Sequence, residues 1–405
     1  MRAEVEAILA RVAAEGDAAL LDYTARFDRQ RLGAEQLRVG ADEIAQAVRG
    51  CPAELRAALE LAAERIDAFH RRQLPQALDY RDELGVGLGL RWRPIEAVGI
   101  YVPGGTAAYP SSVLMNALPA RIAGVERLVM AVPAPGGALN PLVLLAAHLT
   151  GVDEIYRVGG AQAIAALAFG TATISPVDKI VGPGNAYVAE AKRQVFGRVG
   201  IDMIAGPSEI VVVADGDQDP EWIAADLLSQ AEHDALAQAI LITDSESLAD
   251  RVAAAALRQF EALPRRAIAA ASWRDFGAIV VVPDLGEAPA LVDRLAPEHL
   301  ELLVAEPAAM AERVRNAGAI FLGPHTPEVI GDYLGGPNHV LPTDRSARFA
   351  SGLSVYDFLK RTTLLSCTAE SFAALGPPAA ALAQAEGLLG HARAVTMRLG
   401  TAAPG

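Results

Sequence analysis

Cysteine is scarce in this chain of 405 residues, and its two thiols, Cys51 and Cys367, are isolated and far apart. Two such thiols exclude a disulfide framework and a CxxC zinc motif, and they are typical of the reducing cytoplasm. Any metal ion must therefore be bound through nitrogen and oxygen ligands. The first residues, MRAEVEAILARVAAEGD, also lack the basic, apolar and small-residue zones of a signal peptide, so we expect a cytoplasmic protein.

Positive charge is in deficit, because 35 Lys and Arg stand against 49 Asp and Glu, for a formal net charge of −14. This sign argues against binding to a nucleic-acid backbone. Long uncharged stretches exist at residues 97–120, 128–152 and 158–177, but Pro, Gly and polar residues interrupt each of them. Interrupted segments of this kind do not suit a membrane, so we predict a buried α/β core and no membrane partner.

After a helical start, short predicted strands alternate with predicted helices along the chain. Residues 1–75 carry apolar side chains at helical spacing, with Pro52 opening the longest predicted helix. Short β-branched runs then predict strands at residues 97–102, 127–132, 154–159 and 178–182. Predicted helices separate them at residues 112–123, 141–149, 161–169 and 186–196. This alternation predicts parallel βαβ units.

A second series of the same kind follows Gly206. It predicts strands at residues 209–214, 239–243, 278–282, 299–304 and 319–323, with helices at residues 222–232, 247–260 and 307–316. Strand signals fade after about Leu341, and an Ala-rich helical tail follows. We therefore expect an α/β protein with four parts: a helical arm at residues 1–90, α/β domains at residues 91–205 and 206–342, and a tail at residues 343–405.

The glycine fingerprint GxGxxG of a dinucleotide fold is missing. Glycine turns do follow the predicted strands, at residues 103–105, 159–160 and 182–184, where ligands of a parallel sheet usually bind. Three polar residues adjoin these turns: Tyr101, Gln162 and Asn185. Each alone is more often a turn cap or a satisfied core residue, but their common place at strand ends indicates one shared crevice.

The segment SQAEHD contains a candidate metal-binding pair. Gln230 and His233 are three residues apart on a predicted helix and therefore share a face. Imidazole is a good zinc ligand, whereas a side-chain amide is an uncommon one, so the spacing supports His233 and leaves Gln230 open. The alternative is an ordinary capped helix end.

Glu298 and His299 stand directly before an apolar strand and could act in one site if they occupy the loop ahead of it. A neutral imidazole can accept an alcohol proton, and a carboxylate can deprotonate water. The alternative is a solvent-exposed pair at the entrance of a strand.

Two further carboxylate and imidazole pairs stand near the C-terminus. Asp332 and His339 lie in a Gly/Pro-rich loop after the strand at residues 319–323, again at the edge where sites form, and suit a metal or a substrate. An Asx turn with a structural histidine is equally compatible with that spacing. Glu386 and His391 are five residues apart and do not share a helix face cleanly, so they are either solvated or brought to another subunit's cleft.

Taken in order, eight blocks of the sequence resemble the histidinol dehydrogenase family over nearly the whole chain. Ordered blocks are far more specific than any single motif above. The blocks are GIYVPGGTAAYPSSVLMNALPA, VGGAQAIAALAFGT, VGPGNAYV, DMIAGPSEIVVVAD, LLSQAEHDALAQAILIT, RLAPEHLEL, GDYLGGPNHVLPT and SGLSVYDFLKRTT. One departure is Asp344-Arg345, which stands where a glycine-like turn is expected.

The resemblance implies an NAD-dependent, zinc-containing homodimer that oxidises L-histidinol through L-histidinaldehyde to L-histidine, reducing two NAD. It implies two Rossmann-like three-layer (αβα) domains with parallel sheets, and a dimer-spanning tail that completes the partner's site. The implied zinc ligands are Gln230, His233, Asp332 and His391. The implied substrate contacts are Ser208, Gln230, His233, His299, Asp332, His339, Glu386 and His391. The implied NAD contacts are Tyr101, Gln162 and Asn185.

The resemblance also implies the catalytic roles. His299 is expected to remove the alcohol proton as hydride leaves, and Glu298 to activate the water that adds to the aldehyde. Three alternatives stay open: a related zinc and NAD dehydrogenase of another small polar alcohol, a non-catalytic protein that binds a metal or metabolite, and a zinc hydrolase. Glu386, His391 and His339 argue against the first, and Glu298 with His299 against the second. The cluster of Tyr101, Gln162 and Asn185 would serve no purpose in the third.

Overall fold

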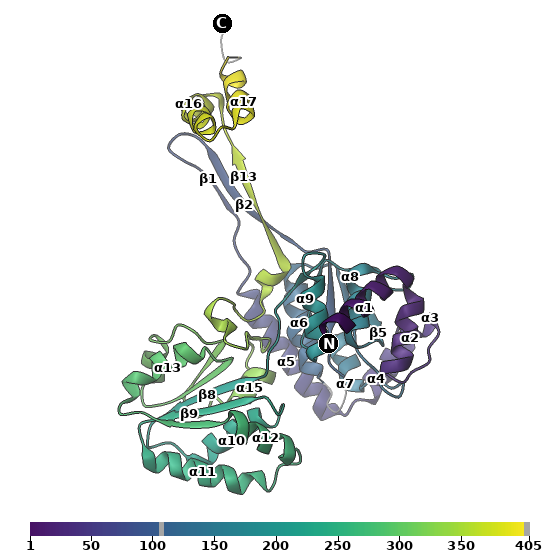
Figure 1. The fold of residues 1–405 in the computed structure, drawn as a ribbon, viewed down its shortest axis with the longest axis vertical. Helices are drawn as coiled ribbons and strands as arrows, with labels where there is room; N and C mark the ends of the chain where they lie inside the picture. Colours follow the sequence, from purple (N-terminus) through teal and green to yellow (C-terminus); the bar gives the residue numbers. More distant parts are fainter. Residues whose placement is uncertain (105–108, 401–405) are drawn as a thin grey trace. The chain divides into compact units, whose positions relative to one another are not determined.

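The structure is a computed structural model that describes residues 1–104 and 109–400. The chain divides into two compact units, one made of Met1–Gln73 with Ile95–Phe358 and the other of Leu74–Pro94 with Leu359–Gly405. Each unit is described separately below, with the element labels of Figure 1. The domain boundaries that we predict at residues 90, 205 and 342 remain predictions.

The first sheet of the larger unit is wholly parallel, with the strand order β5-β4-β3-β6-β7. The chain therefore reverses its winding between β3 and β6, which is the arrangement of a doubly wound fold. The first four of these strands confirm the predicted ones, whereas β7 has only two residues and was not predicted. The strands are β3 (Ala97–Tyr101), β4 (Arg127–Ala131), β5 (Glu154–Tyr156), β6 (Lys179–Val181) and β7 (Gly200–Ile201).

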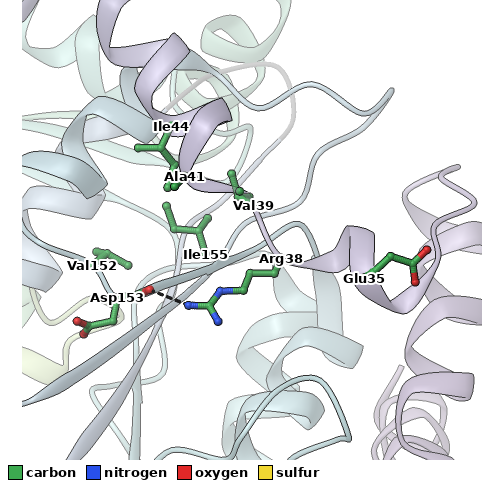
Figure 2. A pocket seen from close by; sticks show the side chains of 9 residues that line it. Glu35, Arg38, Val39, Ala41, Ile44, Val152, Asp153 and Ile155 are labelled. Atoms are coloured by element: carbon green, nitrogen blue, oxygen red, sulfur yellow. Dashed lines mark hydrogen bonds between the residues drawn. The ribbon is translucent and has the colours of Figure 1, made fainter.

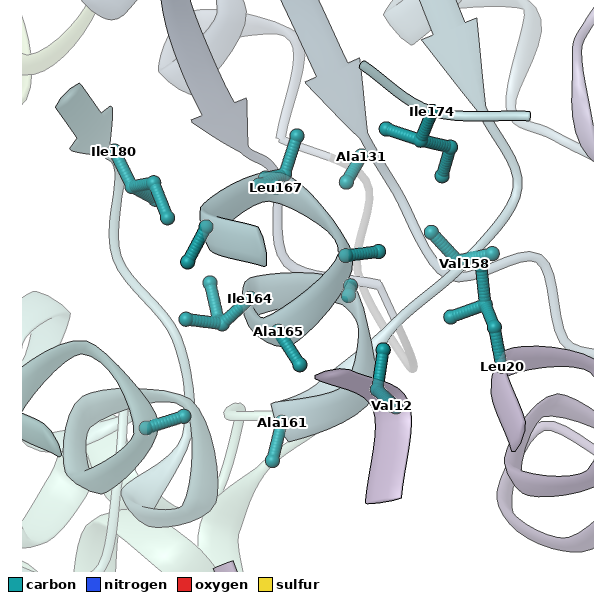
Figure 3. Close-up of a cluster of buried hydrophobic side chains, with 14 of the residues drawn as sticks. Val12, Leu20, Ala131, Val158, Ala161, Ile164, Ala165, Leu167, Ile174 and Ile180 are labelled. Carbon is teal, nitrogen blue, oxygen red and sulfur yellow. The ribbon is translucent and has the colours of Figure 1, made fainter. Parts of the chain in front are cut away.

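Helices cover both faces of this sheet, as the α/β prediction requires. The connecting helices are α6 (Pro110–Ala123), α7 (Pro141–Leu149), α8 (Gly160–Phe169) and α9 (Ala186–Val195). The N-terminal helices are α1 (Arg2–Glu15), α2 (Asp17–Phe27), α3 (Ala34–Leu37), α4 (Ala41–Gly50) and α5 (Ala53–Arg71). Val12 of α1 and Leu20 of α2 pack beside Ile164 of α8 in one buried cluster (Figure 3). The helical start of the chain is therefore part of the first core.

The second sheet repeats the same topology, with the order β10-β9-β8-β11-β12 and all strands parallel. All five strands confirm the sequence prediction: β8, β9 and β11 are buried apolar runs, whereas β10 and β12 at the two edges of the sheet are partly exposed. They are β8 (Glu209–Ala214), β9 (Gln238–Thr243), β10 (Ala278–Val281), β11 (His299–Leu303) and β12 (Ala319–Leu322).

Two buried clusters lie on the opposite faces of the second sheet, which makes it the middle of three layers. Its helices are α10 (Pro220–Ala231), α11 (Glu246–Phe260), α12 (Arg266–Phe276), α13 (Ala288–Leu295), α14 (Pro307–Ala311) and α15 (Glu328–Tyr333). Short 3-10 turns occupy Leu285–Glu287, Ser346–Arg348 and Val355–Phe358. The helix predicted at residues 307–316 ends earlier than expected, and α12, α13 and α15 were not predicted.

The smaller unit combines an antiparallel sheet with two helices. Its strands β1 (Leu78–Arg81), β2 (Gly87–Pro94) and β13 (Leu359–Ser366) pair in the order β1-β2-β13, and none of them was predicted. The helices α16 (Ala369–Ala385) and α17 (Leu389–Gly400) confirm the expected helical tail. No helix in the described part of the chain has the length and apolarity needed to cross a membrane.

Candidate active site

His299 is the first residue of β11 and lies buried in the second α/β domain. Its Nδ1 is 3.0 Å from the backbone carbonyl oxygen of Glu209 and 3.4 Å from a carboxylate oxygen of Glu328. Because a carbonyl oxygen can only accept, Nδ1 carries the ring proton and Nε2 keeps its lone pair. Burial lowers the pKa of His299 to about 3, so the ring is neutral at neutral pH.

The Nε2 atom of His299 is buried and has no hydrogen-bond partner among the residues that the structure describes. It lies 3.8 Å from Oδ1 of Asp332. A buried acceptor without a partner is unfavourable unless a ligand satisfies it. The geometry therefore suits an imidazole that takes a proton from a bound molecule or binds a cation.

Glu298 immediately precedes β11, as the predicted loop position requires. Its Oε2 accepts the backbone N–H of Glu209 at 3.1 Å, and its own N–H donates to Oε2 of Glu209 at 3.3 Å. Burial, followed by the charges of Asp332 and Glu209, raises the pKa of Glu298 well above its ordinary value. A buried carboxylate with a raised pKa is a stronger base toward water than an exposed one.

The backbone before this pair is held in an unusual conformation. Ala296 ends α13 with a φ of 50°, in the left-handed region that a residue with a Cβ rarely adopts. Pro297 then fixes its own φ directly before Glu298. The two residues turn the chain so that both Glu298 and His299 are buried.

Asp332 and His339 meet across the loop that follows α15. The Nδ1 of His339 is 3.0 Å from the backbone oxygen of Asp332, so this ring also carries its proton on Nδ1. Burial lowers the pKa of His339 to about 4, and burial raises the pKa of Asp332. Asn338 holds the loop, because its Nδ2 donates to Met115 O at 2.6 Å and its Oδ1 accepts from Val340 N at 2.9 Å.

The prediction that this loop forms a site at the carboxyl edge of the sheet is wrong. Asp332 faces His299, which is the first residue of its strand, so the site gathers at the amino edge. The reason is that α15 runs back past the sheet after β12, and the loop then reaches the start of β8, where Asp344 N donates to Glu209 Oε1 at 3.1 Å. A site at the carboxyl edge therefore stays a prediction for the first domain alone.

Gln230 lies fully buried in the last turn of α10. With its amide nitrogen toward Glu328, it donates to Oε2 at 2.9 Å and to Oε1 at 2.6 Å. His233 stands just beyond the end of this helix, is exposed at the surface, and donates its N–H to the carbonyl of Gln230 at 3.1 Å. Burial is the main cause of the lowered pKa of His299 and of His339, and the charge of His233 adds a smaller contribution in the same direction.

The side chains of His299, Glu328 and Asp332 offer ligand atoms that all lie within 4.8 Å of one another. Imidazole nitrogen, carboxylate oxygen and the nearby amide of Gln230 are donors that zinc and similar divalent ions accept. The carboxylate of Asp332 and the amide of Gln230 are therefore donor types that fit a divalent cation, and Nε2 of His299 stays available as a base beside it.

The sequence analysis did not predict roles for two acidic residues near His299, Glu209 and Glu328. It also did not predict the buried pair formed by Glu301 and Asp226. Glu209 opens β8, and burial raises its pKa to about 7. Glu328 has a pKa raised by burial and by the neighbouring carboxylates. Glu301, two residues after His299 on β11, and Asp226 of α10 both have pKa values raised chiefly by burial. The one available signal was the spacing of Glu328, four residues before Asp332.

The remaining predicted substrate residues lie in two places. Ser208 directly precedes Glu209, is half-buried, and its carbonyl accepts the N–H of Gln238 at 2.9 Å. Glu386 ends α16 and His391 lies in α17, so both belong to the smaller unit, where both are exposed. The roles predicted for these residues stay predictions.

The predicted NAD contacts stand at the carboxyl ends of strands in the first domain. Tyr101 ends β3, is buried, and its hydroxyl accepts the N–H of Gly160 at 3.1 Å, while burial raises its pKa to about 12. Gln162 is buried, and its Nε2 has no partner in the described part of the chain. Asn185 is exposed, and its Oδ1 caps α9 by accepting from Tyr187 N and Val188 N.

The glycine turns beside these residues are required by close packing. A Cβ on Gly159 would lie 2.5 Å from Pro133 Cβ, and one on Gly182, whose φ is +107°, would lie 2.1 Å from the carbonyl oxygen of Tyr101. The backbone therefore approaches its neighbours closely at the strand ends, and the buried amide of Gln162 fits a polar ligand there. Gly105, in the first predicted turn, lies outside the described residues.

A separate surface pocket lies between the N-terminal helices and β5 (Figure 2). Two of its polar lining residues are already engaged, since Arg38 donates to the carbonyl of Asp153 at 3.2 Å and Asp153 Oδ2 accepts from Leu128 N at 2.7 Å. The pocket therefore has a structural explanation and stands apart from the site around His299. Its lining residues are Glu35, Arg38, Val39, Gly40, Ala41, Ile44, Val152, Asp153 and Ile155.

Two doubly wound sheets, one with polar residues at its strand ends and the other with a buried imidazole among cation-compatible side chains, define the class as an α/β enzyme. The chain belongs to the histidinol dehydrogenase family, whose model matches residues 1–399. It is therefore an oxidoreductase.

Relatives cover almost the whole chain. The histidinol dehydrogenase of Rhodospirillum rubrum is 67% identical over 396 residues, which cover 98% of this chain and 91% of the relative. That of Rhizobium meliloti is 63% identical over 399 residues, covering 98% and 92%. The crystal structure of histidinol dehydrogenase from Elizabethkingia anophelis is 40% identical, with a TM-score of 0.95 and coverage of 98% of this chain and 92% of that chain.

A more distant likeness concerns the fold alone. An acetylating aldehyde dehydrogenase from Geobacillus thermoglucosidasius is 14% identical with a TM-score of 0.51, covering 91% of this chain and 97% of that chain. The paired α/β architecture is therefore shared beyond the family.

Proposed function

We propose that this protein oxidises L-histidinol through L-histidinaldehyde to L-histidine, the last two steps of histidine biosynthesis, using two NAD and a zinc ion. Family membership supports the reaction. The single observation that carries the chemistry is the neutral, buried His299, whose Nε2 has a lone pair and no partner in the described residues. That atom is the base which both oxidations require.

His299 takes the hydroxyl proton of the alcohol while the hydride on the same carbon leaves, which gives the aldehyde. Its Nδ1–H bond to Glu209 stabilises the tautomer that accepts at Nε2. NAD, when bound, supplies the hydride acceptor. We propose Tyr101, Gln162 and Asn185 as its contacts, with the unpaired Nε2 of Gln162 as the clearest open donor.

The aldehyde has no hydride to give until water adds to its carbonyl carbon. Glu298 takes a proton from that water as the oxygen attacks, and His299 gives the proton that it took from the alcohol to the carbonyl oxygen. This yields the hydrate and frees Nε2 of His299 again. His299 then takes a hydroxyl proton of the hydrate as the second hydride leaves, and the product is the carboxylic acid. The raised pKa of Glu298 supports its role as the water-activating base.

Gln230, His233 and Asp332 would hold the zinc ion, together with His391 of the partner subunit. Zinc, when bound, supplies an attachment point for the imidazole and amine of histidinol, which orients the substrate. Ser208, His299, His339 and Glu386 would complete the substrate contacts. Asp332 and His339 are linked to each other at 3.0 Å, which supports placing both at one ligand.

We propose a homodimer whose active sites are shared through the smaller unit. Leu365, Leu382 and Leu389 are 70%, 67% and 70% exposed in the single chain, beside the exposed Glu386 and His391. Exposed apolar groups of this size indicate an interface. We propose the cytoplasm as the compartment, since the two free cysteines suit a reducing environment.

The test is the number of NADH formed per L-histidinol consumed by the purified, zinc-loaded protein with NAD in excess. Two NADH with histidine as the product are expected. One NADH would mean an alcohol dehydrogenase that stops at the aldehyde. No NADH would favour a dehydrogenase of another small polar alcohol or a binding protein, and a panel of amino alcohols would separate these two.

A further inference from the structure

The side-chain amide of Gln230 has two ends that differ in what they can bind. Its Oε1 can bind a cation or accept a hydrogen bond, whereas its Nε2 can only donate. Because Gln230 is fully buried, water does not decide which end faces the site. The neighbouring protein groups therefore determine the orientation of the amide.

Glu328 is the group that faces the amide most closely. Its two carboxylate oxygens lie 2.9 and 2.6 Å from the amide nitrogen when that nitrogen is turned toward them. With the amide reversed, Oε1 would face two carboxylate oxygens at these distances, and acceptor would stand against acceptor. The reversal would replace two charge-assisted hydrogen bonds by repulsion between oxygen atoms. The orientation with Nε2 of Gln230 toward Glu328 is therefore strongly favoured.

Glu328 is itself held firmly by the fold. It is the first residue of α15, is buried, and its backbone N–H donates to Oε1 of the buried Glu301 at 2.7 Å. It lies one helical turn before Asp332, so both side chains emerge on one face of α15. Gly331 permits this, because a Cβ there would lie 2.5 Å from the ring of Phe321 in β12.

We propose that Glu328 is a positioning residue: it fixes the amide of Gln230 so that Oε1, and not Nε2, is presented to the metal ion. The inference rests on the zinc site of the proposed function. The carboxylate of Glu328 lies among the candidate ligand groups, but both of its oxygens face the amide of Gln230, so in this proposal Glu328 acts through Gln230 and not as a ligand. Groups that orient metal ligands in this way typically change metal affinity about 10–100-fold when they are removed.

The experiment measures the zinc dissociation constant of the metal-stripped full-length protein by competition with a chromophoric chelator. Four variants are compared with the unmodified chain: Glu328→Gln, Gln230→Ala, the double variant Gln230→Ala/Glu328→Gln, and the exchange Gln230→Glu/Glu328→Gln. Glu312→Gln, the same substitution at an exposed position, is the matched control. Thermal unfolding of each metal-free variant shows whether it is folded.

Glu328→Gln is expected to raise the zinc dissociation constant about 10–100-fold. In the Gln230→Ala background the same change should have no effect beyond about twofold, the usual limit of additivity, because no amide remains to be oriented. The exchange variant should recover most of the affinity, since the new amide at position 328 donates to the new carboxylate at position 230. Glu312→Gln should match the unmodified protein.

An equal loss from Glu328→Gln in both backgrounds would mean that Glu328 binds the ion directly, and the proposal would be overturned. Unchanged affinity in Glu328→Gln would overturn it as well. If that variant does not fold, failure of the folded exchange variant to bind zinc within about tenfold of the unmodified protein has the same meaning. If the unmodified protein itself shows no competitive zinc binding, the proposed zinc site fails together with this inference.

Discussion

Replacement of His299 by Asn is expected to remove much of the acid sensitivity of the metal-free protein. Asn is a suitable substitute because its amide nitrogen takes the place of Nδ1 and can still donate to the carbonyl of Glu209, which His299 approaches at 3.0 Å. The substitution therefore removes the titrating ring and retains its principal hydrogen bond.

The magnitude follows from the lowered pKa of His299, which falls from 6.5 to about 3 on burial. The unfolded chain takes up a proton below pH 6.5, whereas the folded chain does not until about pH 3. The contribution of His299 to the free energy of unfolding is therefore complete above pH 6.5, and it is lost as the pH falls from 6.5 to about 3. The loss is about 2 kcal/mol between pH 7 and pH 5, and about 5 kcal/mol when it is complete.

The assay is urea unfolding of the metal-free protein and of His299→Asn at pH 7, 6 and 5. The difference between the two proteins isolates this residue, because the other titrating groups are common to both. The unmodified protein should lose about 2 kcal/mol more than the variant between pH 7 and pH 5. Parallel pH profiles, or an imidazole NMR resonance of His299 that titrates near pH 6.5, would refute the reasoning.

Three further predictions concern catalysis and stability. Glu298→Gln should slow the oxidation of L-histidinaldehyde about 10²–10⁴-fold and that of L-histidinol much less, measured as NADH formation from each substrate; equal losses would contradict the assigned role. Lys192→Met should destabilise the protein by about 3–5 kcal/mol in denaturant unfolding, because it leaves the buried carboxylate of Asp202 unpaired, while Arg193→Met at the exposed neighbouring position should have little effect. Arg345→Gly should stabilise the protein by about 1 kcal/mol, since Arg345 has a φ of 60°, whereas Arg348→Gly in the adjacent 3-10 turn should destabilise it.

Asp344 and Arg345 stand in a turn where the sequence comparison leads us to expect a glycine-like residue. A glycine-like turn was expected at this position, and both residues adopt left-handed conformations, with φ values of 51° and 60°. Asp344 N donates to Glu209 Oε1, so the turn supports the carboxylate that bonds to Glu298. The conformation is retained without glycine because these bonds hold it.

All strands of the two parallel sheets except the two-residue β7 were predictable, because they are short apolar runs between turn-forming segments. The strands of the smaller unit were not, since β2 and β13 mix Gly, Arg, Lys and Thr with apolar residues, and β13 lies largely exposed while β2 is mostly half-buried. Their pairing joins residues 87–94 to residues 359–366. Because the two paired strands are so far apart in the sequence, no local pattern of residues predicts that they pair.

Sequence alone determined the α/β class, through hydrophobic periodicity, and the family, through eight ordered blocks. By resemblance it also predicted roles for Glu298, His299 and Asp332, but not for the neighbouring Glu209 and Glu328. Only the tertiary structure decided that Nε2 of His299 is the free nitrogen, because the carbonyl that accepts from Nδ1 belongs to Glu209 on another strand. It likewise brought the carboxylates of Glu209 and Glu328 to the site, and it located the site at the amino edge of the second sheet. These features depend on which distant segments pack together, and long-range packing is not encoded in the spacing of any one motif.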